Sequence, residues 1–223
     1  MTLLILGLVP LPLLVYGGGA SWQWGWLGAL AWAVSLVVKI PVTGSVYALS
    51  ASMPGLPRAA LSGLISSLSE LGVAALLFDL RPLPSPALPN VLAFGAGAGC
   101  LETLFVFAAM FFESPPADQV ARWLDGARSS FCVRHVQTIE RVTAFGGHVG
   151  ARGLISLSIY GGSPAIAVVA IVSFAVTDGL AAYGSLRDWD WFKPATCRRF
   201  HGACIAISTM ELALFAILSA SML

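Results

Sequence analysis

Long apolar runs, separated by short polar or proline-rich breaks, restrict this chain to very few folds. A helix needs about 20 mostly apolar residues to cross the hydrocarbon core of a bilayer. Within that core every backbone group must bond inside its own element, so each run is expected to be a helix. The sequence therefore predicts an all-α fold: a polytopic transmembrane helical bundle of about seven spans, forming one integral membrane domain over residues 1–223. The expected spans are residues 3–16, 22–49, 59–80, 91–112, 136–160, 164–184 and 201–223.

Composition supports a membrane protein and excludes other classes. Hydrophobic residues make up 57% of the chain, charged residues make up 10%, and the mean hydropathy is +0.84. A soluble chain carries about 25% charged residues. The formal net charge of +1 provides no concentrated basic face, so no nucleic-acid partner is expected. The four cysteines contain no CxxC pair and predict neither a disulfide framework nor a zinc knuckle.

The breaks between the runs indicate how the chain is oriented. The segment at about 113–135 is polar enough to be a cytoplasmic loop with an interfacial helix, whose Trp123 is expected at headgroup depth. The N-terminal run lacks a basic region and a cleavage site, so it predicts a retained span. Basic residues gather in the loops on the N-terminal side, and only Arg81 falls opposite. We expect an integral protein of a bacterial cytoplasmic membrane, with a cytoplasmic N-terminus and the lipid bilayer as a partner.

Six ionisable residues lie deep within the predicted spans. They are Lys39, Glu70, Glu102, His148, Asp178 and Glu211. A charge at a helix centre costs roughly 2.5 to 3.5 kcal/mol on insertion scales, so independent, scattered charges would be hard to tolerate. These side chains are therefore expected to converge on one interior site, where they are paired or hydrated. By contrast, His135 and His201 fall at predicted span ends, where interfacial water would solvate them.

The fifth run places several polar side chains on nearby faces of one helix. Glu140 and His148 are eight residues apart, which corresponds to about 80° around the helix and about 12 Å along it. His148 and Arg152 are four residues apart and so lie on one face. In the fourth run, the alternate glycines before Glu102 are expected to let a neighbouring helix, or a substrate strand, come close to that carboxylate.

Four segments occur in a recognisable order. They are SSLSELGVAALLF, FGAGAGCLETLF, IERVTAFGGHVGARGLISLSI and SFAVTDGLAAYG. The most specific pieces are the GxGxGxxE run that ends at Glu102 and the pair Glu140 and Arg141 followed by His148. On these motifs, about half of the chain resembles the YhfC family of membrane proteins. That family is a branch of the superfamily that also holds the CPBP and PrsW intramembrane proteases and the Aph scaffold subunit of gamma-secretase.

The resemblance implies an endopeptidase that works inside the bilayer and depends on a glutamate or a metal. Glu70, Glu102 and His148 match the family's membrane-embedded polar positions. In this interpretation Glu70 or Glu102 is the general base. His148 is an oxyanion donor, or it binds a divalent metal such as zinc together with Glu102 and Asp178, with Asp178 alternatively orienting His148. The predicted supporting residues are Glu140, Arg141, Arg152, Gly95, Gly97 and Gly99.

Two departures from the family pattern leave other functions open. Members carry a Glu-Glu pair followed by Arg in the first motif, whereas Ser69 precedes Glu70 here, and Ala98 stands where members carry a His. One alternative is a non-catalytic, multi-span subunit that scaffolds a larger membrane complex. Another is a small transporter or proton relay, because intramembrane Glu, His and Asp also mark ion paths.

Structural interpretations of the same residues also stay open. Glu70 and Glu102 are candidates for hydrogen bonds across helices to nearby serines and Thr103. His148 and Arg152 are candidates for a structural pair that faces a carboxylate. Lys39 is expected to be a counter-ion, and Glu211 is expected to be a packing partner.

Overall fold

The computed structural model describes residues 2–80, 87–112 and 115–222, and every regular element in these ranges is an α-helix. The helices are α1 (Thr2–Leu8), α2 (Pro10–Tyr16), α3 (Trp22–Leu49), α4 (Gly55–Leu80), α5 (Leu88–Ala109), α6 (Ala117–Ser129), α7 (Phe131–Arg134), α8 (Val136–Gly161), α9 (Pro164–Leu186) and α10 (Pro194–Met222). The all-α fold that the apolar runs predict is confirmed.

Five of these helices, α3, α4, α5, α9 and α10, are long and apolar enough to cross a membrane, which indicates an integral membrane protein. The 26-residue helix α8 is not among them, although the sequence predicts a span there. Every residue of α8 from His148 to Ser158 is buried, because α5, α9 and α10 pack around it. A helix enclosed by other helices does not need an apolar outer face. Its position therefore allows α8 to carry Arg141, His148 and Arg152.

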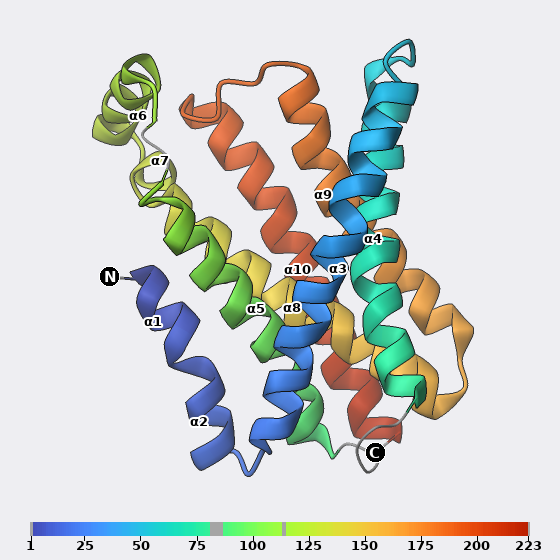
Figure 1. The fold of residues 1–223 in the computed structure, drawn as a ribbon. Helices are drawn as coiled ribbons and strands as arrows, with labels where there is room; N and C mark the ends of the chain where they lie inside the picture. The colour runs from blue at the N-terminus through green and yellow to red at the C-terminus, as the bar shows by residue number, and fades with distance from the viewer. Residues whose placement is uncertain (1, 81–86, 113–114, 223) are drawn as a thin grey trace.

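The first predicted span is a pair of short helices. Helices α1 and α2 have seven residues each and meet at Val9, directly before Pro10, whose ring cannot remain in a helix interior. At 1.5 Å per residue the pair extends about 22 Å, which is less than the ~30 Å of a hydrocarbon core. Figure 1 shows the pair, in dark blue, beside α5 and covering only part of the height of the bundle.

Helix ends differ from the predicted span ends where polar residues continue a helix. Helix α4 begins at Gly55, four residues before the predicted 59, and α5 covers Leu88–Ala109 instead of 91–112. Helix α10 begins at Pro194, seven residues before the predicted 201. Hydropathy marks where an apolar surface begins, whereas a backbone stays helical as long as its own hydrogen bonds continue. His201 consequently lies inside α10 and is buried, so its expected place at a solvated span end is wrong.

The connections from α3 to α4, from α5 to α8 and from α9 to α10 lie at one end of the bundle, and the C-terminus lies at the other (Figure 1). We call the end that carries these three connections the basic end. The basic residues in or beside those connections are Arg58, Arg122, Arg128, Arg134, Arg187, Lys193, Arg198 and Arg199. Arg81, which the sequence places opposite them, lies outside the described residues.

The helix predicted within residues 113–135 is present as α6, followed by the short α7 at the basic end (Figure 1). Trp123 of α6 donates its indole N–H to the carbonyl of Val133 at 3.1 Å, and both residues join a small hydrophobic cluster with Ala127 and Cys197. Trp123 thus bonds within the protein. The position of α6 at headgroup depth stays a prediction.

A disulfide joins Cys132 of α7 to Cys197 of α10, with 6.3 Å between the two Cα atoms. The expectation that the cysteines form no disulfide framework is therefore wrong for this pair. The two residues are 65 positions apart, so no local spacing indicates the bond. They meet because α10 begins before Cys197 and carries it to the basic end beside α7. Cys100 and Cys204 are free and buried.

The alternate glycines of α5 bring it against two helices at once. A Cβ added at Gly95 would lie 2.6 Å from the Cα of Val149 in α8, and a Cβ at Gly99 would lie 2.8 Å from the ring of Phe145 in α8. A Cβ at Gly97 would overlap the backbone of Gly25 in α3. The glycines therefore let neighbouring helices come close, as predicted. Because those helices fill the space, the alternative expectation of a substrate strand beside the glycines is wrong.

Candidate intramembrane site

The deep ionisable residues of six helices line one cavity of about 320 Å³. They are Lys39 of α3, Glu70 of α4, Glu102 of α5, His148 of α8, Asp178 of α9 and Glu211 of α10. Glu140 and Arg141, at the start of α8, line the same cavity. This is the convergence on one interior site that the depth of these residues predicts, and Glu140 and His148 face the cavity together as their spacing requires.

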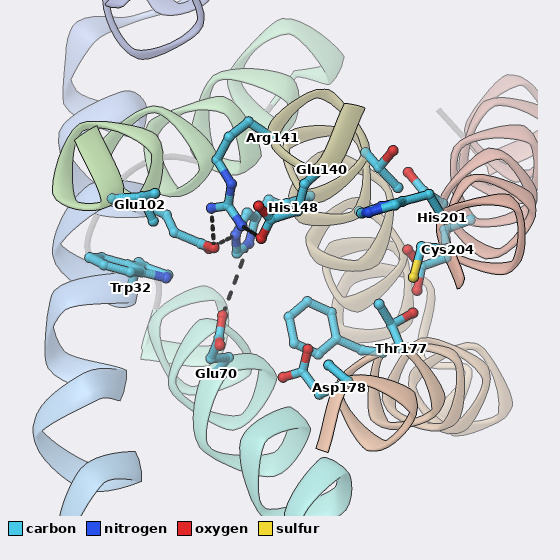
Figure 2. Close-up of a pocket in the computed structure, with 18 of the residues that line it drawn as sticks. Trp32, Glu70, Glu102, Glu140, Arg141, His148, Thr177, Asp178, His201 and Cys204 are labelled. Atoms are coloured by element: carbon cyan, nitrogen blue, oxygen red, sulfur yellow. Dashed lines mark hydrogen bonds and ion pairs between the residues drawn. The ribbon is translucent and has the colours of Figure 1, made fainter. Parts of the chain in front are cut away.

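Glu102 is held by two partners from α8. Arg141 donates from Nη1 to Oε1 of Glu102 at 2.7 Å, and Nε2 of His148 contacts Oε2. The second guanidinium nitrogen of Arg141 donates to Glu140 at 2.5 Å. Figure 2 shows Glu102 and Arg141 converging on His148. Both oxygens of Glu102 are therefore engaged, yet its side chain remains 20% exposed toward the cavity.

The partners of His148 fix which ring nitrogen carries the proton. Nδ1 of His148 contacts Nη1 of Arg152, one helical turn further along α8. A guanidinium can only donate, so Nδ1 must accept. In the neutral ring the proton then resides on Nε2, which donates to Glu102. Arg152 thus orients His148 as a donor toward the Glu102 carboxylate.

Glu70 joins this cluster to α3 and α9. Arg152 donates to Oε2 of Glu70 at 3.1 Å, and Nζ of Lys39 lies 3.0 Å from Oε1. Lys39 also lies 3.6 Å from Asp178, which accepts a hydrogen bond from Ser66. Polar contacts therefore run without a gap from Glu140 to Ser66. We call the residues joined by this series of contacts the paired wall. They are Glu140, Arg141, Glu102, His148, Arg152, Glu70, Lys39, Asp178 and Ser66.

These contacts decide between the structural interpretations of the sequence. Glu70 and Glu102 bond to cations and to His148, so the expected bonds to serines and Thr103 are wrong; Thr103 instead donates to the carbonyl of Gly99. Lys39 is a counter-ion, as expected. His148 and Arg152 form a pair that faces carboxylates, as their spacing indicates.

Burial makes the pairing on this wall energetically important. Arg152 is 0% exposed and Glu70 is 3% exposed. Removing one partner of a buried ion pair leaves an uncompensated charge and costs about 3 to 5 kcal/mol. The paired wall therefore restrains α3, α4, α5, α8 and α9 relative to one another.

The opposite side of the cavity carries a carboxylate with a different environment. Glu211 of α10 is 2% exposed, and its Oε1 accepts a hydrogen bond from Ser173 of α9 at 2.5 Å. Ser208 and His201 of α10 line the cavity on the same side. We call Ser173, His201, Ser208 and Glu211 the acid wall. Figure 2 shows His201 and Cys204 across the cavity from Glu102.

The predicted metal ligands do not gather into a metal site. His148 engages both ring nitrogens with Glu102 and Arg152, whereas Asp178 lies with Lys39 and Ser66. Among the described residues no group of three or more His, Cys, Asp and Glu side chains is placed to hold a metal ion. The residues present therefore do not fit the zinc that the resemblance implies.

The cavity borders another cavity toward the basic end. A second cavity of about 710 Å³ lies among α6, α7, α8 and the α9–α10 connection, and shares Glu140, Ala181, Phe200 and His201 with the first. In the other direction the bundle is filled by Trp24, Phe78 and Phe94, which are buried and in ring contact. The site is thus an apolar-walled chamber with polar groups on two sides. It shares lining residues with the cavity at the basic end and also, through Trp32, Leu36 and Phe105, with a cavity between α3 and α5.

Comparison of this chain with protein-family models, with curated proteins and with solved structures found no match. The resemblance to the YhfC family therefore stays a prediction.

Sequence reasoning missed His201 and Ser173 as parts of the site. His201 was missed because the apolar run begins after the helix does. Ser173 begins the segment SFAVTDGLAAYG, but the sequence does not show that it bonds to Glu211. Ser66 was expected near Glu70 and Glu102, and it bonds to Asp178 instead.

Proposed function

We propose that the protein is an intramembrane endopeptidase-like hydrolase in which Glu102 is the general base. The observation that carries the proposal is the contact of Glu102 with His148 and Arg141 on the wall of the cavity. A carboxylate oxygen has two lone pairs, so Glu102 can accept from these donors and still accept a proton from water in the cavity. His148 and Arg152 act as positioning residues that keep the carboxylate oriented.

The proposed reaction is hydrolysis of an amide bond in a membrane-embedded substrate. Water gives a proton to Glu102 while its oxygen attacks the carbonyl carbon, and the C=O electron pair moves onto the carbonyl oxygen. Arg141 or Lys39, the cations on the cavity lining, stabilise this oxyanion. When the oxyanion collapses, the C–N bond breaks and the proton passes from Glu102 to the leaving nitrogen. One water is consumed, and an acid and an amine are released.

Isotope labelling tests this reaction directly. Host-cell membranes that contain the protein are incubated in ¹⁸O-water, and new peptide carboxyl termini are identified by mass spectrometry. We expect labelled termini from the wild type and from Asp79→Asn, an exposed carboxylate in the last turn of α4 that lies outside the cavity. Glu102→Gln is expected to lower the labelling about 100-fold or more. Unchanged labelling in Glu102→Gln, or none in the wild type, would reject the hydrolase.

We place the protein in a bacterial cytoplasmic membrane, with about seven passes if α8 and the α1–α2 pair are counted with the long apolar helices. The gathering of basic residues at one end supports a cytoplasmic location for that end. The N-terminus is then expected toward the cytoplasmic side. Membrane lipid surrounds the long apolar helices, and the substrate is a membrane protein.

A second candidate function is a proton relay or small transporter. The gathering of Glu70, Glu102, His148 and Asp178 on one cavity favours it, because Asp, Glu and His side chains form proton relays in membrane proteins. In reconstituted vesicles, a pH gradient would then decay faster with the wild type than with Lys39→Met, which interrupts the contacts between Glu70 and Asp178. Equal decay with the wild type, Lys39→Met and empty vesicles would exclude the relay.

A further inference from the structure

Glu211 presents a carboxylate oxygen to the cavity without a partner. Oε1 is occupied by Ser173, whereas Oε2 makes no hydrogen bond to any described residue. No Lys, Arg or His of the described chain lies within 4 Å of this carboxylate. Gly147 of α8 lies beside it, where even an added Cβ would remain 3.6 Å from Oε2. The space next to this oxygen is therefore open.

The whole cavity has more acidic than basic groups. The five carboxylates on its lining are Glu70, Glu102, Glu140, Asp178 and Glu211, and the two cations on its lining are Lys39 and Arg141. Arg152, directly behind Glu70, is a third cation. Glu140 is exposed to solvent, so four inner carboxylates face three cations, which leaves an excess of one negative charge. Buried carboxylates of this kind require protons or an added cation.

The remaining lining favours an organic cation over a hydrated inorganic ion. Trp32, Phe105, Phe174 and Phe200 contribute aromatic rings to the same cavity. Aromatic faces attract cations, and they also bury hydrocarbon. A cavity of about 320 Å³ has the size of a small-molecule site.

We propose that this cavity binds an organic cation, an amine or quaternary ammonium group with an apolar body, and that Glu211 is its counter-ion. The charged group lies against Oε2 of Glu211 and offsets the acidic excess. The apolar body lies among the aromatic rings. This inference concerns binding and holds whether or not Glu102 hydrolyses a substrate.

Two probes of the same shape, one charged and one neutral, test whether the cavity prefers a cation. Benzyltrimethylammonium and its neutral isostere neopentylbenzene differ by one atom, nitrogen against carbon. Binding is measured by fluorescence of the tryptophans, which include Trp32 on the cavity lining, with the protein in nanodiscs of uncharged lipid. Protein-free nanodiscs correct for partition into lipid. We expect the cation to bind the wild type at least 10-fold more tightly than the isostere.

Two substitutions at one position then test the role of Glu211. Glu211→Gln is expected to remove the preference for the cation, whereas Glu211→Asp, which retains the charge, is expected to keep most of it. Asp79→Asn controls for an exposed carboxylate outside the cavity. Equal binding of the two probes by the wild type would overturn the proposal, as would a preference that survives in Glu211→Gln. Because no turnover is measured, failure here is distinct from failure of the hydrolase.

Discussion

The two sides of the cavity hold buried carboxylates in contrasting ways. On the paired wall, Glu70 and Glu102 lie against guanidinium or ammonium groups within 3.1 Å. On the acid wall, Glu211 accepts a hydrogen bond from a serine hydroxyl, and no cation of the described residues lies within 4 Å of it. A buried ion pair restrains the helices that carry it, whereas a buried carboxylate without a nearby cation is an uncompensated charge that a bound proton or cation would stabilise. The paired wall therefore restrains the bundle, whereas Glu211 is available to a ligand, as its proposed role as a counter-ion requires.

The largest expected effect comes from Arg152→Leu on the paired wall. Among the described residues, the substitution leaves Lys39 as the remaining cation within bonding distance of Glu70, and it removes the donor that orients His148. We expect a loss of about 3 to 5 kcal/mol in the free energy of unfolding, measured in detergent by denaturant titration. Arg198→Leu, at an exposed site on α10, is the matched control. Equal losses in both variants would show that the paired wall gives no restraint.

Cys132→Ser tests whether the two sides are joined at the basic end. The disulfide ties α7, next to α8 of the paired wall, to α10 of the acid wall across 65 residues. Its removal is expected to cost about 2 to 4 kcal/mol under oxidising conditions. A reductant should lower the stability of the wild type to that of the variant and leave the variant unchanged. If the wild type resists the reductant while the thiols become reactive, the bond does not stabilise the bundle.

Gly95→Ala tests the close packing beneath the paired wall. The added methyl group would meet the backbone of Val149 and push α5 from α8, which separates Glu102 from His148. We expect a loss of about 1 to 3 kcal/mol in unfolding free energy. Gly202→Ala in α10, where nothing lies within 4 Å of the added atom, should instead stabilise by up to about 1 kcal/mol. A similar sign for both substitutions would contradict the packing argument.

Glu211→Gln is expected to change stability little, in contrast to Arg152→Leu. No ion pair is lost, and the amide oxygen can still accept from Ser173. The unfolding free energy should stay within about 1 kcal/mol of the wild type. A loss as large as that of Arg152→Leu would mean that Glu211 has a cationic partner within the protein, and the contrast between the walls would then fail.

The smallest loss of stability is expected from the exposed ion pair of Asp118 and Arg122 on α6. These residues lie four positions apart, Nη1 of Arg122 is 2.7 Å from Oδ2 of Asp118, and both side chains are more than half exposed. Asp118→Asn is expected to cost only about 0.3 to 0.5 kcal/mol and to lose that effect in high salt. Thermal unfolding at low and high ionic strength provides the measurement. A larger, salt-resistant loss would show that exposed charges restrain this protein as strongly as the buried ones.

Parts of the site were predictable because they depend on one helix at a time. His148 and Arg152 share a face of α8 because helical neighbours are four residues apart. The deep positions of Glu70 and Glu102 required partners, since lipid cannot solvate them. In contrast, the contacts of Glu70 with Lys39 and Arg152 join residues 31 and 82 positions apart, and no periodicity connects them.

The other misses have the same origin. His201 is buried because α10 begins seven residues before its predicted start, and Cys197 reaches Cys132 for that reason. Helix α8 lacks the apolar surface of a lipid-facing span because other helices enclose it. Hydropathy describes contact with lipid, so it reports poorly on helices and helix ends that contact protein.

The sequence by itself determined that this chain forms an α-helical membrane protein and that its deep charges must meet inside it. Both conclusions follow from the free energy of moving backbone and side-chain polar groups out of water, which depends on residue type alone. Only the tertiary structure decided which cation meets which carboxylate and left Glu211 with a hydroxyl. That choice depends on how each helix is rotated about its axis and how closely glycines such as Gly95 let it approach its neighbours, and packing across the whole bundle sets both.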